Sequence, residues 1–486
     1  MVQLARKVLK NVIYNSLSIL ISKSGGLIFT IILARLLSPE LFGMYHLALA
    51  IGFLLLSFTD LGINRTLIRY VSYAISKNDV ILARSYFRYL LKLKFVLASF
   101  SSLSLILLAN PLALHVFHEP SLYPSLIIVG IFLFFQSFLD FVESVFISLQ
   151  KFEFTTIRHI TYETSRLFLV PLLILLGYYV YGALGGLTIS VVLSLLVLIH
   201  FLLRKYNFLI KGKIIKVERK RILRFLSYLT VGTVSGIIFA YVDSIMLGIF
   251  MPVKYVGFYR AAYNIVFAFI GLVSIAGVLF PVFTGLEGKE LETVFKRVFK
   301  YSAMLSFPCA VGLAYMAEPF IEIIYGPDYK LSVLPLYILS LLIVISPLDF
   351  FIILFNAKER PEYPAKLVII SSILNIVLNY LLIIKIGMIG AAIATVISRY
   401  FNVTCLGLLS KKIFGILPEI DTIYKPMFSS LIISLFLYFI PTPKIPYVSK
   451  LIFMLIIYIC IMFLIKGIEK EDIRYLSAIL GPKRYM

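Results

Sequence analysis

Apolar residues recur with unusual regularity between Asn11 and Lys466, in about fourteen runs of roughly 20 residues separated by short polar gaps. A run of that length crosses a bilayer as an α-helix, because lipid offers backbone amide and carbonyl groups no partner outside the helix. The pattern therefore predicts an all-α polytopic membrane protein without a soluble domain. The predicted transmembrane helices are 11–34, 44–64, 95–110, 125–149, 157–176, 182–203, 225–250, 257–284, 301–324, 333–356, 366–384, 388–410, 427–441 and 450–465.

Positive charge is distributed unequally over the gaps. Of the 46 Lys and Arg residues, 37 fall in alternate gaps and only seven on the opposite side. Such a bias predicts that both termini are cytoplasmic and that the protein lies in the cell (inner or plasma) membrane. The net charge of +22 would suggest nucleic acid in a soluble protein, but topology explains it here. The basic run 211–224 is accordingly interpreted as an orienting signal at the anionic leaflet.

Nothing in the chain predicts a metal, a disulfide or a cofactor. Cys309, Cys405 and Cys460 lie within apolar runs without paired spacing. The phosphate-loop pattern G-x-x-x-x-G-K-[ST] is missing, so ATP hydrolysis by this chain is not expected. An ion gradient, the membrane potential or a substrate gradient would have to drive any transport.

The sequence also repeats itself. Residues 33–51, LARLLSPELFGMYHLALAI, align without a gap to residues 247–265, LGIFMPVKYVGFYRAAYNI. Related pairs are 139–141 with 348–350 and 182–190 with 390–398. Two parallel six-helix repeats plus two C-terminal helices are therefore predicted, an architecture of alternating-access transporters. The expected domains are an N-lobe at 1–210, a basic linker at 211–224, a C-lobe at 225–412, and the last two spans with a cytoplasmic C-terminus at 413–486.

At these residues the chain resembles a known family. The turn RLLSPELFGMY at 35–45, the segment DLGINRTLIRY at 60–70 and the Gly-Ala turns at Gly182 and Gly390 are similar to the polysaccharide-transporter branch of the MOP flippase superfamily, the Wzx-like flippases. The resemblance implies a flippase that moves lipid-linked oligosaccharide of the polyprenyl-phosphate type from the cytoplasmic to the outer leaflet by alternating access. It implies a lipid-linked glycan, membrane lipids and glycan biosynthesis enzymes as partners, and a monomer.

Cations inside the apolar runs are the candidate substrate contacts, because an intramembrane charge marks a pathway or a buried pair by default. Lys23 shares a helix face with Ser16, Gly26 and Thr30, a small polar stripe suited to a cavity wall. Guanidinium and ammonium groups would suit a diphosphate. Structural alternatives remain open, namely buried ion pairs for Lys23 and Arg399 and snorkelling to lipid for two other arginines. The full candidate set is Lys23, Arg65, Arg166, Arg260, Asn375, Asn379 and Arg399.

Four aspartates are candidates for coupling or gating: Asp60, Asp140, Asp243 and Asp349. Asp140 and Asp349 occupy matching Leu-Asp-Phe positions in the two repeats, so each is expected to pair with a cation of its own lobe. Hydrogen bonding that only holds helix ends together is the structural alternative. Lys23 is the expected partner of Asp243, since the first helices of the two repeats should be neighbours.

Three other function classes are alternatives to a flippase of lipid-linked oligosaccharide. An enzyme would need catalytic groups in the outer loops, which offer only His115, His118 and Glu119 without metal-ligand spacing. A drug or cation antiporter of the related MATE branch and a flippase for a peptidoglycan precursor are the closer alternatives.

Overall fold

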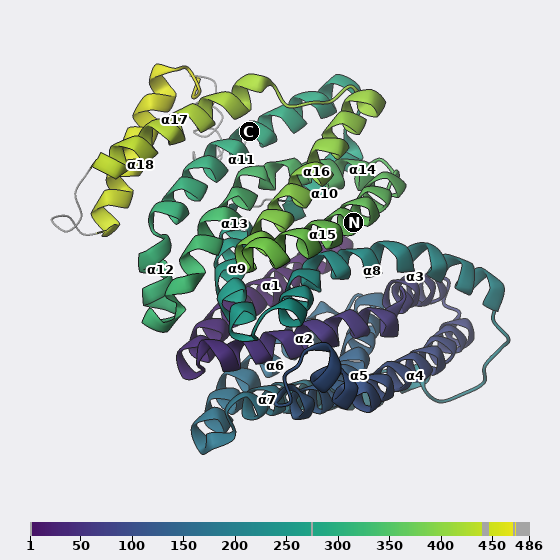
Figure 1. The fold of residues 1–486 in the computed structure, drawn as a ribbon. Helices are drawn as coiled ribbons and strands as arrows, with labels where there is room; N and C mark the ends of the chain where they lie inside the picture. The colour runs from purple at the N-terminus through teal and green to yellow at the C-terminus, as the bar shows by residue number, and fades with distance from the viewer. Residues whose placement is uncertain (1, 274–275, 440–446, 470–471, 473–486) are drawn as a thin grey trace. The chain divides into compact units, whose positions relative to one another are not determined.

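The computed structural model describes residues 2–273, 276–439, 447–469 and 472 (Figure 1), and within these ranges the chain is helical and contains no strand. This confirms the all-α class. The helices are α1 (Val2–Leu36), α2 (Pro39–Asp60), α3 (Ile63–Ser76), α4 (Val80–Pro111), α5 (Leu122–Ser148), α6 (Phe152–Leu173), α7 (Tyr179–Lys205), α8 (Arg219–Phe250), α9 (Lys254–Val273), α10 (Ala276–Gly285), α11 (Gly288–Tyr315), α12 (Ala317–Ile324), α13 (Val333–Ile345), α14 (Phe350–Ala357), α15 (Glu362–Ile386), α16 (Met388–Phe414), α17 (Ile420–Phe439) and α18 (Tyr447–Leu464). Short π or 3-10 turns are η1 (Leu112–Val116), η2 (Ile174–Tyr178), η3 (Asn207–Leu209), η4 (Pro327–Ser332) and η5 (Ser346–Asp349).

Many of these helices can cross a membrane. Among the described residues, 8 helical segments are long and apolar enough, or 9 if the bent pair α11 and α12 is one span. One segment, Phe152–Lys205, has 54 residues, about 80 Å of helix, which is more than twice the thickness of a bilayer core. It reverses at Gly177 and Tyr179, both with positive φ, and so contains two spans, α6 and α7. The predicted spans fall on helices, but 257–284, 301–324 and 333–356 are each divided between consecutive helices, and residues 274–275 and 440–441 lie outside the described residues. The count of fourteen crossings stays a prediction.

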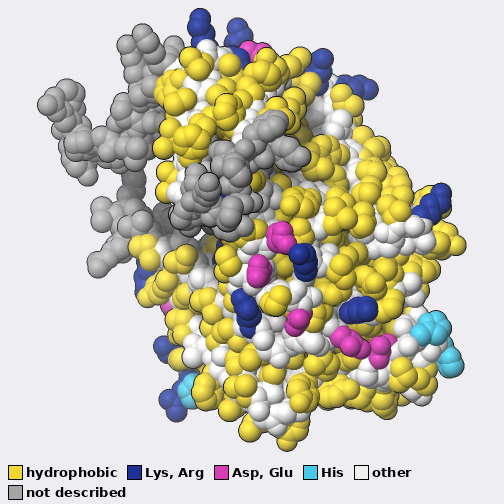
Figure 2. Space-filling view, turned by 60° about the vertical axis from the view of Figure 1, so that its left-hand side comes forward, with side chains coloured by type: hydrophobic (Ala, Val, Ile, Leu, Met, Phe, Trp, Pro, Cys, Tyr) yellow, Lys and Arg dark blue, Asp and Glu magenta, His cyan; other side chains and the backbone are white. Residues whose placement is uncertain are grey.

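Most of the face drawn in Figure 2 is covered by hydrophobic side chains. Large apolar residues are correspondingly exposed along several helices, for example Phe100 at 71% and Leu107 at 76% on α4. In a soluble protein such a surface would favour aggregation. On a chain with eight or nine apolar helices of spanning length, it is the surface that lipid covers.

The chain forms two compact units. The first comprises residues 1–261 with 324–329 and 368–391, and within it α4, α5, α6 and α7 lie side by side. The second comprises 262–323, 330–367 and 392–486, in which α11 packs on α13, α17 and α18. Because compactness groups α8 and part of α15 with the N-terminal half, the lobe boundaries expected from the sequence remain a prediction.

Local sequence explains where the helices of the first unit begin and end. Ser38 caps α2 by accepting a hydrogen bond from the Leu41 amide, and Pro39 occupies the first turn. The helix stops at Leu61 and Gly62, both left-handed. Asp79 caps α4 through the Leu82 amide, 2.8 Å away, so α4 begins fifteen residues before its predicted span. Charged residues of this extension are tolerated because they lie outside the apolar run.

Helix α3 was not expected, because the sequence analysis treated this region as a cytoplasmic loop. Its buried residues Ile63, Leu67, Val71 and Ala74 recur every three or four positions, which makes one apolar stripe. The opposite face carries exposed Arg65 and Arg69. An amphipathic helix of 14 residues is too short and too polar for a span, so hydropathy alone missed it.

The internal repeat is visible in matching contacts. Gln150 and Glu359 occupy equivalent positions and both have positive φ, 55° and 57°. In each repeat the next amide donates to the phenylalanine carbonyl that lies five residues earlier, at 2.9 Å for Phe146 and 2.8 Å for Phe355. Each of these phenylalanines also packs on the ring eight residues later, with centroids 4.6 Å apart for Phe146 and 5.4 Å apart for Phe355. The two repeats therefore share the same turn and the same aromatic pair.

Two equivalent glycines mark where the repeats meet within the first unit. A Cβ on Gly43 would lie 2.2 Å from the carbonyl oxygen of Val253, and a Cβ on Gly257 would lie 2.1 Å from that of Pro39. Gly43 and Gly257 are repeat equivalents, as are Pro39 and Val253. The contact is therefore symmetric: the turn at the start of α2 accepts the backbone of the turn at the start of α9 and the reverse, and only glycine fits at the crossing.

Candidate functional site

Two of the predicted binding cations are open. Lys23 on α1 and Arg65 on α3 have exposed side chains. Among the residues that the structure describes, no ion pair or side-chain hydrogen bond engages either of them. Lys23 lies within the apolar segment Ser16–Leu36, where a charge exposed to lipid is unfavourable.

Arg166 is held inside the first unit. Its guanidinium is paired with Glu163, one turn earlier on α6. It also stacks over two aromatic rings, at 4.2 Å from the centroid of Phe29 and 5.0 Å from that of Tyr162. These contacts join α6 to α1, which makes Arg166 a packing residue in this conformation.

Arg260 is also buried, with 6% exposure. It donates to the Ser244 hydroxyl and to the carbonyl of Ala240, 3.2 Å away, and its guanidinium lies over the ring of Tyr241. Its predicted substrate role would require these contacts with α8 to be replaced.

Asp243, Asn375 and Asn379 form one buried network. The Asn379 amide donates to Asp243 at 2.6 Å and to Asn375 at 3.1 Å, and the Tyr259 hydroxyl donates to the other oxygen of Asp243 at 2.7 Å. The expected pairing of Asp243 with Lys23 is wrong. Asp243 is 2% exposed and enclosed by these donors, whereas Lys23 points outward.

Asp349 and Arg399 form an ion pair in the second unit, with Nη2 and Oδ1 2.6 Å apart. The expectation that Asp349 holds a cation of its own repeat is met by this contact. Both side chains remain partly exposed, at 27% and 29%. Arg399 is thus neutralised by a carboxylate, as the alternative of an ion pair expects, and part of its side chain remains exposed.

Lys94 is the most deeply buried cation among the described residues, at 1% exposure. Its ammonium lies 3.5 Å from Asp60 at the end of α2, and the charge of Asp140 also acts on it. Asp60 accepts a further hydrogen bond from the Asn64 amide, at 3.0 Å, which helps to start α3. An ion pair therefore ties α4 to the junction of α2 and α3.

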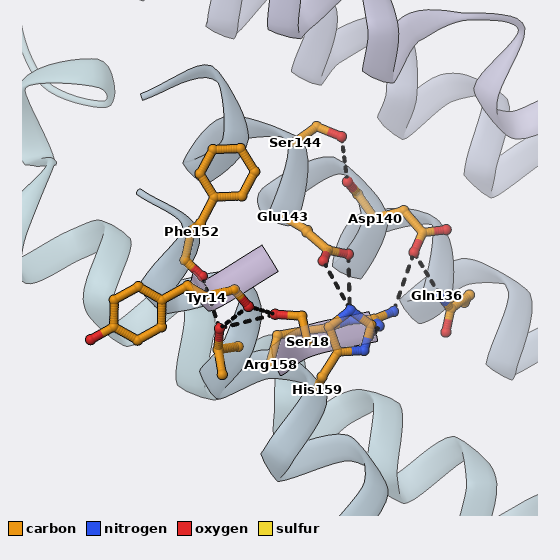
Figure 3. Close-up of polar contacts among 10 residues, drawn as sticks. Tyr14, Ser18, Gln136, Asp140, Glu143, Ser144, Phe152, Arg158 and His159 are labelled. Carbon is orange, nitrogen blue, oxygen red and sulfur yellow. Dashed lines mark hydrogen bonds and ion pairs between the residues drawn. The ribbon is translucent and has the colours of Figure 1, made fainter. Parts of the chain in front are cut away.

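Asp140 lies at the edge of a larger cluster, drawn in Figure 3. Gln136 donates to its carboxylate at 2.7 Å, and Arg158 from α6 lies 3.6 Å away. The same arginine pairs with Glu143 at 3.5 Å and contacts His159. Asp140 therefore holds a cation of its own repeat, as expected, and the cluster joins α5 to α6. Arg158 and Arg399 are not repeat equivalents, so the two matching aspartates are neutralised from different helices.

Lys94, Arg158 and His159 are not among the residues predicted from the sequence. Lys94 was counted among the cytoplasmic charges, although it lies on the buried stripe Leu90, Lys94 and Ala98 of α4. The four-residue spacing of these positions is the signal in the sequence from which the burial of Lys94 could be predicted. Arg158 and His159 carried none, because only the fold brings the start of α6 against α5.

These arrangements offer charge pairs and amide networks. Among the described residues no group of three or more His, Cys, Asp or Glu side chains is placed to hold a metal ion. The chemistry available is recognition of an anion by the open cations and a change in pairing or protonation at the carboxylates.

One carboxylate outside the membrane spans gives a pH prediction. Burial of Asp472 opposes its ionisation, but hydrogen bonds from Lys300, from the Glu469 amide and from the Tyr301 hydroxyl outweigh it and hold the pKa of Asp472 below its ordinary 3.8. A carboxylate whose pKa is lower in the folded state than in the unfolded state stabilises the fold at pH values above its ordinary pKa. This stabilisation is lost as the pH falls through the pKa of the folded state.

We therefore expect the stability difference between wild type and Asp472→Asn to be constant near neutral pH and to shrink below about pH 4. Thermal unfolding of the purified protein as a function of pH measures it. Asp421→Asn is the control, because Asp421 is 67% exposed in its pair with Lys425. A pH-independent difference for Asp472→Asn would contradict the assigned interaction.

Comparison with known proteins relates this chain to a family. The chain matches the profile of the family described as polysaccharide biosynthesis protein over residues 8–287. It is 24% identical to an uncharacterised membrane protein of Methanocaldococcus jannaschii, over 81% of this chain and 82% of the relative. It is also 24% identical to the probable low-salt glycan biosynthesis flippase Agl15 of Haloferax volcanii, over 51% of this chain and 52% of the relative.

Among solved structures, the lipid II flippase MurJ in an inward closed conformation has a similar fold. The TM-score is 0.75 at 18% sequence identity, and the match covers 93% of this chain and 98% of that chain. At this level of identity the likeness concerns the fold alone.

Proposed function

Because the chain belongs to the polysaccharide biosynthesis protein family, we propose that it is a flippase that moves lipid-linked oligosaccharide across the membrane. The cargo is an oligosaccharide on a polyprenyl-phosphate type carrier, turned from the cytoplasmic to the outer leaflet by alternating access. The resemblance stated from sequence and the name of the relative Agl15 both favour this cargo class. We also propose that the protein works as a monomer in the plasma membrane, with both termini cytoplasmic, and that glycan biosynthesis enzymes supply its substrate.

The observation that carries the proposal is the open cation on α1. A lysine within a span costs about 3 kcal/mol when it is exposed to lipid. Lys23 is exposed, and no carboxylate among the described residues neutralises it. A phosphate-bearing headgroup would offset this cost, because its negative charge would pair with the ammonium group. Arg65 is the second open cation, on the amphipathic helix α3.

Coupling to an energy source is assigned to the carboxylates. Asp60, Asp140 and Asp349 each lie beside a cation and remain partly exposed. Asp243 is buried and accepts hydrogen bonds from Asn379 on α15 and from Tyr259 on α9. We place a gating role on Asp140 and Asp349, whose ion pairs can open with conformation. We place a coupling role on Asp243 as well, because its buried hydrogen bonds with Asn379 and Tyr259 join α8 to α15 and α9.

Replacing Lys23 by Ala should reduce translocation at least tenfold at unchanged protein abundance, because the anionic headgroup loses its open cation. Proteoliposomes with a fluorescent polyprenyl-diphosphate oligosaccharide and a membrane-impermeant quencher measure the rate. Lys23→Arg keeps the charge and should retain activity, and Ser24→Ala changes an exposed neighbour whose hydroxyl bonds only its own helix. Arg399→Ala is a poorer first test, because it leaves Asp349 without its ion pair.

Full activity of Lys23→Ala would remove this residue from the binding site. Two alternatives are tested by cargo in the same vesicles. Transport of a cationic dye with no movement of the oligosaccharide would identify a MATE-like antiporter, and exclusive transport of a peptidoglycan precursor would identify a flippase of that other class.

A further inference from the structure

The segment between α7 and α8 is held against the protein in a defined way. Arg84 on α4 donates to the carbonyls of Phe208 and Lys213, at 2.6 and 2.7 Å. Arg88, one turn later, donates to the carbonyl of Ile210. The Ile215 amide donates to the Ser85 hydroxyl at 2.9 Å. Residues 206–218, here called the linker segment, are therefore fixed through their backbone to the first turns of α4, beside which Figure 1 draws them.

Glycine at position 212 makes this attachment possible. Its φ of 126° is left-handed, and a Cβ there would lie 2.4 Å from Nη1 of Arg84. The guanidinium of Arg84 thus occupies the space that any side chain would take. The backbone carbonyls of the linker segment accept hydrogen bonds from the two arginines. The side chains of the segment are therefore free to face outward.

Those outward side chains are of two kinds. Lys211, Lys213 and Lys216 are exposed and have no carboxylate partner among the described residues. Ile214 and Ile215 lie between them, each 51% exposed. Two adjacent exposed isoleucines are unfavourable in bulk water. Flanked in the sequence by lysines, they suit a surface that is both apolar and anionic.

The place of the linker segment in the chain identifies that surface. It joins the end of one predicted span at 203 to the start of the next at 225. Its anchor Arg88 precedes the apolar run of α4 by seven residues, about 10 Å of helix. An isoleucine pair at this height reaches the boundary between headgroups and acyl chains, and the lysines reach the headgroups. An acidic partner protein would be recognised by the lysines alone and leaves the isoleucine pair unexplained.

We propose that the linker segment is a membrane-surface anchor that binds anionic phospholipid headgroups through Lys211, Lys213 and Lys216 and inserts Ile214 and Ile215 at the interface. Because Arg84 and Arg88 fix its backbone beforehand, little ordering entropy is lost on binding. The anchor ties the N-terminal end of α4 to the inner leaflet. It goes beyond transport, since it assigns a lipid-binding surface outside the substrate pathway.

The chain contains no tryptophan, so a single introduced tryptophan reports its own surroundings. Ile214→Trp and Ile215→Trp are reconstituted in vesicles of phosphatidylcholine with or without phosphatidylglycerol. With the anionic lipid we expect a blue-shifted emission, quenching by brominated acyl chains and protection from acrylamide. Raising the salt concentration should weaken the effect, because the lysines act by charge.

The charge-removal variant K211Q/K213Q/K216Q, made in the Ile214→Trp background, should lower the ratio of inserted to free segment about 100-fold. K289Q/K411Q/K412Q removes the same number of exposed charges elsewhere and should have no effect. Emission typical of water in both lipid mixtures overturns the proposal in favour of a segment open to the cytosol. Equal insertion in neutral and anionic vesicles overturns the headgroup selectivity, and so does insertion that survives the charge-removal variant.

Discussion

Gly257→Ala is expected to lower the stability of the folded protein by about 3 kcal/mol, as severe overpacking does. The added methyl group would lie 2.1 Å from the Pro39 carbonyl oxygen and 3.1 Å from the Gly43 amide nitrogen. Both are backbone atoms, so no side chain can rotate away and the turns at the starts of α2 and α9 must separate. A lower apparent melting temperature and a reduced rate of oligosaccharide translocation would both follow.

The symmetry of the crossing sharpens this prediction. Gly43→Ala should have a similar effect, because its methyl group meets the equivalent carbonyl of Val253 at 2.2 Å. Since separation of the turns relieves both clashes, the double variant should lose less than the sum of the two single losses. Gly185→Ala on α7 is the control, as nothing lies within 4 Å of its Cβ position. That variant should be neutral or up to about 1 kcal/mol more stable, because alanine favours a helix.

If Gly257→Ala is as stable as wild type, the close approach of these two turns is not a property of the folded protein. Equal effects of Gly257→Ala and Gly185→Ala would lead to the same conclusion, since helix propensity alone would then account for them.

Much of the fold could be predicted because the bilayer restricts the possibilities to helices of known length. The repeat could be predicted because the turn after Phe146 has the same backbone shape as the turn after Phe355. The two turns have therefore kept similar sequences. Helix α3 could not be found in the same way, since its signal is a narrow apolar stripe and the search followed long apolar runs. The early start of α4 depends on the cap by Asp79, a short-range signal that hydropathy does not contain.

The candidate site was only partly predictable, for a different physical reason. A charged residue inside an apolar run is conspicuous in sequence, but its partner depends on tertiary contacts. Asp349 and Arg399 were both singled out, yet their pairing required the fold. Asp243 was assigned to Lys23 by an argument from symmetry, and the structure surrounds it with Tyr259 and Asn379 instead. Charge counting identifies residues that need partners and leaves the choice of partner open.

The buried pair of Lys94 and Asp60 should give the other large effect. Asp60→Asn leaves the ammonium of Lys94 at 1% exposure without its nearest carboxylate, which should cost about 3 kcal/mol of stability. Lys94→Met should cost less, because Asp60 is 23% exposed and keeps the hydrogen bond from the Asn64 amide. The double variant replaces both charges by neutral groups of similar size and should recover most of the loss. Thermal unfolding of the four proteins gives the coupling energy, expected at about 2 kcal/mol.

The exposed pair of Lys330 and Glu318 provides the matched control. Its ions are closer, at 3.0 Å, but its side chains are 77% and 57% exposed. The same cycle with Lys330→Met and Glu318→Gln should therefore give no measurable coupling energy, because water and salt screen the pair. Equal coupling in the two cycles would show that burial of Lys94 adds nothing.

Transport measured on the same Asp60 variant separates structure from coupling. If Asp60 only fixes α4 to the junction of α2 and α3, the double variant should regain activity together with stability. If Asp60 takes part in coupling, the double variant should be stable and still transport slowly, with an altered pH dependence, because no ionisable group remains at either position. Recovery of the wild-type rate and pH profile would leave Asp243, which lies in a separate network, as the coupling residue to test next.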